Sequence, residues 1–144
     1  MPREIDRQED SESARLYKAK KFVLDQDVWQ WMEEGAVGHF QAEVWTEHGE
    51  ALQLRASTTR NNLRISLTCR QTQLVRKWDS HDGHYNPGGE PILGPHKHYP
   101  TKTHPTGEFA YSVTDIPDSG IDDALLAFLD ECSIEARAGY QRQM

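Results

Sequence analysis

The chain has 144 residues and a formal net charge of −7, and only 36% of its residues are hydrophobic. It contains no run of 18 apolar residues, which argues against a membrane-spanning helix, and its charged first 13 residues lack the apolar stretch of a signal peptide. We therefore expect a cytoplasmic protein with one domain over 14–135, flanked by a disordered tail at 1–13 and a frayed tail at 136–144.

The N-terminal part of the chain has a helical pattern. Ser11 or Ser13 is a candidate N-cap for a helix whose apolar stripe runs over 16–23. A second helical turn is expected over 28–32, and Gly35 would end it.

From His39 onward, apolar residues alternate with polar ones, which is the period of a half-buried strand. The turn residues at 47–50 separate two such segments and predict a hairpin. The strand pattern then returns several times. The expected strands cover residues 40–45, 52–56, 63–70, 74–78 and 108–113.

The strongest helical pattern lies near the C-terminus. Ser119 is placed as an N-cap with Asp122 at the capping-box position, and apolar residues recur at helical spacing through 121–129. These elements predict an α+β fold: a single domain with an antiparallel sheet of about 5–6 strands, packed on one face by the N-terminal helical segment and the C-terminal helix. The face that carries Arg64 and Arg70 would be free to meet a ligand.

The segment 78–104 is rich in histidine and is the first candidate site. The turn over 86–89, Asn-Pro-Gly-Gly, should reverse the chain and carry His84 back toward the following strand. In an extended strand, His96 and His98 point to the same side because they are two residues apart. We therefore predict that these three histidines share a pocket. His81 and His104 would lie at its margins.

The positive charge of the chain is concentrated in one block. Residues 51–78 carry 6 bases and no acid, although the whole chain is acidic. Because phosphate binding depends on Lys and Arg, this block predicts a positive patch beside the histidines that binds nucleic acid. The expected contacts are Arg55, Arg64, Arg70, Arg76 and Lys77.

Residues from about 60 to 134 carry three further motifs. These are a His-x-Asn-Pro-Gly-Gly turn at 84–89, a Pro-His-x-His strand that begins at Pro95, and an aromatic-x-x-x-Cys-x-Ile helix end at 128–134. In these motifs the chain resembles a family of small uncharacterised bacterial and phage-borne proteins, although Gly88 stands where that family more often has Asp. The histidines are also similar to those of toxin components of bacterial toxin–antitoxin pairs. That likeness implies RNA as a target and an antitoxin-like protein as a partner.

In the leading interpretation, the protein is a toxin-like ribonuclease that needs no cofactor. His96 and His98 act as the general acid and base on the ribose 2′-OH, assisted by His84. Lys97, or an arginine of the basic block, would stabilise the negative charge of the transition state.

Two other interpretations of the histidines stay open. His84, His96 and His98 could bind a divalent transition metal such as zinc, with Asp79 or Asp82 completing the shell. The chain could also be a regulatory module without chemistry that docks on a phage or host partner. The plainest alternative is that loop histidines and outward arginines are solvated structural residues.

Two cysteines, Cys69 and Cys132, lie far apart and form no Cys-x-x-Cys pair. We expect buried free thiols, one on a strand and one on a helix, although the sequence does not exclude a disulfide.

Overall fold

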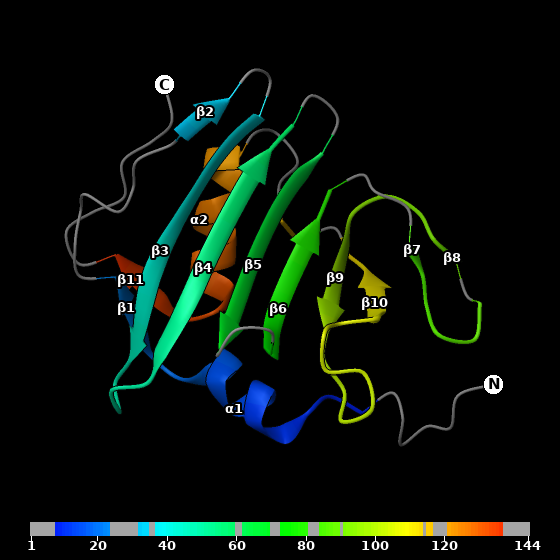
Figure 1. The fold of residues 1–144 in the computed structure, drawn as a ribbon, viewed down its shortest axis with the longest axis horizontal. Helices are drawn as coiled ribbons and strands as arrows, with labels where there is room; N and C mark the ends of the chain where they lie inside the picture. The colour runs from blue at the N-terminus through cyan, green and yellow to red at the C-terminus, as the bar shows by residue number, and fades with distance from the viewer. Residues whose placement is uncertain are drawn as a thin grey trace.

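In the computed structural model, one large sheet forms the body of the protein and two helices pack against it (Figure 1). This confirms the α+β class. The structure describes residues 8–23, 32–34, 37–59, 62–69, 73–80, 84–89, 91–113, 115–116 and 121–136.

Within these residues the main sheet has nine strands in the order β10-β9-β6-β5-β4-β3-β1-β11, and β2 pairs with β3 outside this path. Neighbouring strands are antiparallel except β1 and β11, which are parallel. A separate hairpin, β7 with β8, lies beside the β9–β10 end of the sheet (Figure 1). The strands are β1 (Lys21–Val23), β2 (Met32–Glu34), β3 (Val37–Thr46), β4 (Ala51–Thr58), β5 (Leu63–Cys69), β6 (Gln73–Asp79), β7 (His84–Tyr85), β8 (Pro91–Ile92), β9 (His96–Tyr99), β10 (Phe109–Ser112) and β11 (Ile134–Ala136).

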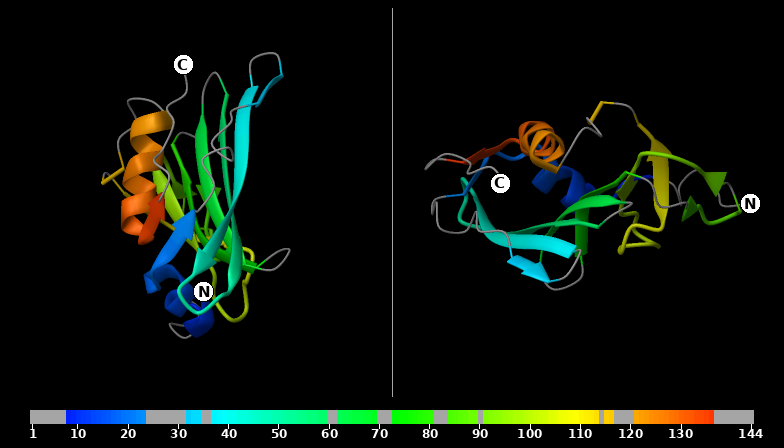
Figure 2. Two further views of the ribbon diagram at one scale, coloured as in Figure 1. Left: turned by 90° about the vertical axis from the view of Figure 1, so that its left-hand side faces the viewer. Right: turned by 90° about the horizontal axis from the view of Figure 1, so that it is seen from above.

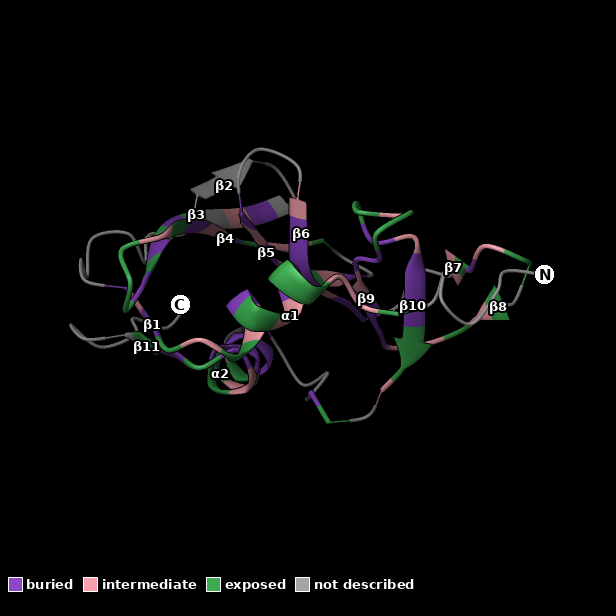
Figure 3. Cartoon of the chain, turned by 90° about the horizontal axis from the view of Figure 1, so that it is seen from below, coloured by how far each residue is buried: buried purple, intermediate pink, exposed green. Residues whose placement is uncertain are grey.

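Both helices lie on the same side of the sheet (Figure 2). They are α1 (Ser11–Lys18) and α2 (Ile121–Glu131). The buried side of α2 faces the sheet (Figure 3), where Phe128 and Leu125 pack with Ile65 and Trp78 in one apolar core. Trp78 is fully buried, so its role is packing. No helix in the described ranges is both long and apolar enough to cross a membrane.

The α2 helix, the hairpin of β3 and β4, and the strand pattern of β5 confirm the sequence prediction. The sheet itself is larger than predicted and is mixed, because residues 21–23 and 134–136 pair in parallel at its far edge. A local pattern could not reveal this pairing, since its two strands are far apart in the sequence.

Several predicted boundaries near the N-terminus need correction. The N-cap of α1 is Asp10, which accepts a hydrogen bond from the Ser13 amide, so neither predicted serine has this role. Glu9 forms a bridge with Thr101 and α1 begins at Ser11, so residues 9–13 belong to the folded domain and not to a disordered tail. Residues 21–23 are a strand rather than the end of a helix, and Met32 also begins a strand.

Other predictions fall on positions that the structure does not describe. These are Ser119, residues 28–31, residues 1–7 and residues 137–144. Cys69 and Cys132 are both buried and form no disulfide, as expected.

Lys21 connects the two ends of the fold from a fully buried position. Its ammonium group donates hydrogen bonds to the backbone carbonyls of Tyr17, Ala19 and Cys132, at 2.9, 2.6 and 2.5 Å. These bonds join the end of α1 to the turn that follows α2. Burial lowers the pKa of Lys21 to about 8, and burial raises the pKa of the Cys132 thiol to about 12.

The Lys21 shift predicts a stability that depends on pH. Above pH 8 the native protein releases this proton while the unfolded chain retains it, so stability rises with pH. Between pH 8 and 9 the contribution of Lys21 is about 1 kcal/mol, and ionisation of Cys132 in the unfolded chain, near pH 8.5, opposes part of it and leaves a smaller net rise. Urea unfolding at both pH values should show this rise in the wild type and in Lys20→Met, whose lysine is exposed. The rise should be absent in Lys21→Met, and an unchanged rise there would contradict the assignment.

Candidate active site

Three adjacent strands bring polar side chains to the side of the sheet opposite α2, which we call the open face; the α2 side is the helix face. Arg64 of β5 pairs with Asp79 of β6, and Asp79 pairs with His96 of β9. Further along β6, Lys77 pairs with His98. Because directly paired residues point to the same side of a sheet, these five side chains share the open face.

The three predicted imidazole rings lie together. The ring centroid of His84 is 4.6 Å from that of His98 and 5.8 Å from that of His96, and the last two centroids are 4.7 Å apart. This confirms the predicted proximity. His96 and His98 are buried, with exposed fractions of 1% and 7%, whereas His84 is half-buried. We call these rings together with the Asp79 carboxylate the histidine centre.

Glycine carbonyls orient the two buried rings. His96 donates from Nδ1 to the Gly94 carbonyl at 2.9 Å, and His98 donates from Nδ1 to the Gly107 carbonyl at 2.8 Å. Both glycines have positive φ, 78° and 91°, and a side chain on Gly107 would collide with Leu74. Both Nε2 atoms are consequently directed toward Asp79.

Four basic groups surround the buried Asp79 carboxylate. The Nε2 atoms of His98 and His96 lie 3.0 and 3.6 Å from Oδ2, and Lys77 Nζ also lies 3.6 Å from it. Arg64 Nε lies 3.2 Å from Oδ1. Burial raises the pKa of Asp79, but the hydrogen bond from His98 and the nearby positive charges outweigh burial and hold the pKa below its ordinary value.

The protonation of His96 is set mainly by its burial, which lowers its pKa. Its bond to the Gly94 carbonyl and the charge of Asp79 act in the opposite direction without cancelling this effect. The ring is therefore neutral near pH 7. Since Nδ1 carries the proton, Nε2 presents a lone pair to Asp79.

The His84 loop is fixed to the edge strand β10. Asn86 donates from Nδ2 to the Ala110 carbonyl at 2.9 Å and accepts the Ala110 amide proton at Oδ1, at 2.8 Å. His84 Nε2 donates to the Glu108 carbonyl at 2.6 Å. Its Nδ1 makes no hydrogen bond within the described ranges, so this nitrogen can accept a proton.

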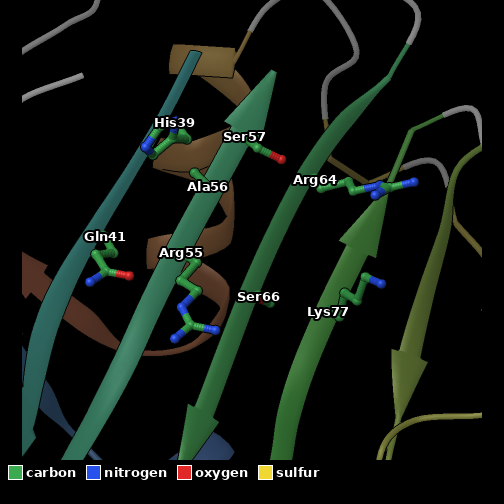
Figure 4. A pocket seen from close by; sticks show the side chains of 8 residues that line it. All are labelled: His39, Gln41, Arg55, Ala56, Ser57, Arg64, Ser66 and Lys77. Atoms are coloured by element: carbon green, nitrogen blue, oxygen red, sulfur yellow. The ribbon is translucent and has the colours of Figure 1, made fainter. Parts of the chain in front are cut away.

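A hollow of about 300 Å³ lies on the open face next to the histidine centre. Figure 4 shows Arg55, Arg64 and Lys77 around it, together with uncharged polar side chains of β3, β4 and β5. Arg64 and Lys77 belong to this hollow and also contact Asp79. The cationic hollow and the histidine centre are therefore adjoining parts of one surface.

The structure separates Lys97 from the predicted site. Because it lies between His96 and His98 on one strand, it points to the helix face, where it is buried and pairs with Asp115 at 2.7 Å and with Glu131 of α2. Burial lowers the pKa of Lys97, but these two carboxylates raise it above its ordinary value. The prediction that Lys97 belongs to the catalytic site is therefore wrong, because its ammonium group lies on the other side of the sheet from the histidines.

The prediction that Arg76 belongs to the basic patch is also wrong. It lies on the helix face, pairs with Glu9 at 2.5 Å and stacks on Tyr17, with its guanidinium carbon 4.0 Å from the ring centroid. His104 packs against Phe109 instead of the other histidines. Arg70, His81 and Asp82 lie outside the described residues.

The sequence prediction did not name the groups that orient the centre. The sequence predicts Asp79 only as an added metal ligand, although its position at the end of a basic strand is a signal of a larger role. The glycines at positions 94 and 107 and the side chain of Asn86 act through backbone contacts that only the folded chain creates.

Fold and site together define an α+β protein with a histidine–aspartate centre on the open face of its sheet. Comparison with protein-family models, curated proteins and solved structures finds no match.

The two Asn86 bonds should anchor the His84 loop measurably. Asn86→Ala leaves a buried amide and a buried carbonyl of Ala110 without partners and should cost about 1–3 kcal/mol of unfolding free energy. Hydrogen exchange of the Ala110 amide should accelerate. Tyr85→Ala, which removes an adjacent side chain that is 74% exposed, should change neither quantity. Unchanged exchange at Ala110 in Asn86→Ala would contradict the anchoring role.

Proposed function

We propose that this protein cleaves RNA, with the histidine centre as the chemical site and the cationic hollow as the contact for the RNA backbone. The observation that carries the proposal is the adjacency of the two features, which share Arg64 and Lys77. Imidazoles supply proton transfer near neutral pH, and fixed cations stabilise charge on a phosphoryl group. Phosphodiester cleavage needs both.

The open face suits a single strand of nucleic acid. Arg55, Arg64 and Lys77 offer charges to successive phosphates, while Ser57 and Ser66 offer hydroxyl groups along the same hollow. No carboxylate is among the described residues that line it. The acidic net charge of the whole chain therefore does not oppose binding at this surface.

His84 is the imidazole best placed to begin the reaction. It is half-buried, and its Nδ1 is available to take the proton of a ribose 2′-OH. The 2′ oxygen then bonds to phosphorus, the bond from phosphorus to the 5′ oxygen breaks, and the 5′ oxygen gains a proton from water while His84 later returns its proton to solvent. The products are a 2′,3′-cyclic phosphate and a 5′-hydroxyl. RNA is the substrate because DNA lacks the attacking group.

The predicted acid–base pair of His96 and His98 fits this chemistry less well. Both rings are buried, both Nδ1 atoms are bonded to carbonyls, and both Nε2 atoms face Asp79. We propose that these two rings act where negative charge develops during the reaction, and not as the base that takes the 2′-OH proton. The resemblance to toxin components supports RNA as the target, and an antitoxin-like protein as a partner belongs to the same proposal.

Binding to RNA should depend on the cations of the open face. Fluorescence anisotropy with labelled single-stranded RNA should show weaker binding for the double variant Arg55→Ala with Lys77→Ala. The slope of log affinity against log salt should fall by roughly 0.7 for each lost phosphate contact. Lys18→Ala, which removes an exposed cation on α1, should bind like the wild type. No binding at low salt, or equal losses in both variants, would remove the proposed contact surface.

Cleavage should depend on His84 and on the ribose hydroxyl. His84→Ala should lower the rate by about 10²–10⁴, with the circular dichroism spectrum unchanged. His104→Ala, whose ring lies outside the histidine centre, should retain the rate. The matching deoxyribose strand should stay intact, and RNA products should end in a cyclic phosphate. If the wild type leaves RNA whole, or cuts DNA equally well, the proposed function is wrong.

A further inference from the structure

We propose that Asp79, His96 and His98 bind one divalent transition metal ion through Oδ2 and the two Nε2 atoms. The role of this ion in cleavage rests on the proposed function, whereas the binding site stands on geometry alone. This ligand set takes Asp79 in place of His84, and it differs from both the cofactor-free chemistry and the three-histidine metal site expected from the sequence.

The spacing of the three atoms fits a metal. The Nε2 atoms of His98 and His96 lie 3.0 and 3.6 Å from Asp79 Oδ2, and all three ligand atoms lie within 4.8 Å of one another. Ligands bonded to zinc at about 2.0–2.1 Å in a tetrahedron are about 3.3 Å apart. The centre could therefore accept such an ion with small movements.

The hydrogen bonds around the site point to the same conclusion. Metal-bound histidines usually donate their other ring N–H to a backbone carbonyl or a carboxylate, and both Nδ1 atoms here donate to glycine carbonyls. With Nδ1 of each ring donating to a carbonyl, the Nε2 atoms are the nitrogens left to bind a metal, and both lie within 3.6 Å of Asp79 Oδ2 inside the protein.

The donor set indicates which ion would bind. Two imidazoles and one carboxylate suit zinc and related divalent transition metals, whereas magnesium and calcium prefer oxygen ligands. Three protein ligands leave a coordination position for another group, which is typical of catalytic sites. In the proposed reaction, the ion would stabilise negative charge on the leaving 5′ oxygen. Binding also displaces any Nε2 proton of His98 to solvent.

Lys77 and Arg64 compete with a metal for the same carboxylate. Their side chains are 36% and 53% exposed and approach Asp79 within 3.6 and 3.2 Å. Removing Lys77 should therefore leave metal affinity unchanged or raise it, although the same change weakens RNA binding. His96→Ala should instead weaken metal binding and leave RNA binding unchanged. The two variants consequently separate the metal site from the RNA surface.

The test uses the full chain, stripped with a chelator and titrated with zinc or with cobalt, whose visible spectrum reports tetrahedral ligation. The wild type, Lys77→Ala and His48→Ala should each bind one ion; His48 is an exposed histidine in the turn after β3. His96→Ala and His98→Ala should bind more than about 100-fold more weakly, since even supporting contacts change affinity by 10–100-fold. Because these two rings are buried, circular dichroism checks that the variants fold.

If either variant does not fold, the melting temperature of the wild type carries the test, because a ligand that binds only the native state raises it. No stoichiometric zinc and no rise in melting temperature would overturn the metal site, even if RNA is cleaved. Undiminished binding in folded His96→Ala and His98→Ala would also overturn it. If zinc binds as expected but RNA stays whole, the proposed function fails and the metal site stands.

Discussion

The buried carboxylate of Asp79 is the constraint on which the open-face site depends. An ionised carboxylate inside a protein costs several kcal/mol unless other groups compensate its charge. Here two imidazoles, Lys77 and Arg64 surround it. These groups come from three neighbouring strands, β5, β6 and β9. The pairing register of the strands therefore also determines which groups compensate the charge of Asp79.

Strand β9 connects this site to the core through the alternation of its side chains. His96 and His98 belong to the histidine centre on the open face, while Lys97 between them points to the helix face and pairs with Asp115 and with Glu131 at the end of α2. Both faces of the strand are buried and polar, which is unusual because each charge must find its own partner. The position of the two rings is thereby tied to the docking of the C-terminal helix.

The local charge of the open face differs from the charge of the chain. Both helices among the described residues lie on one side of the sheet (Figure 2). The outward positions of β4 and β5 carry serine, threonine, glutamine and arginine, and Figure 4 shows four of these side chains, Arg55, Ser57, Arg64 and Ser66. The acids that make the protein anionic lie largely elsewhere in the sequence. A ligand that meets this face encounters cations, which is why net charge alone is a poor guide to the partner.

The sequence by itself determined the α+β class, the β3–β4 hairpin, the α2 helix and the proximity of His84, His96 and His98. Each of these follows from local periodicity or from a turn, which act over a few residues. Only the tertiary structure decided which face each charge occupies. It moved Arg76 and Lys97 to the helix face, paired β1 with β11, and brought Asp79, Gly94 and Gly107 to the rings. These outcomes depend on strand order and register, and no local pattern encodes contacts between distant segments.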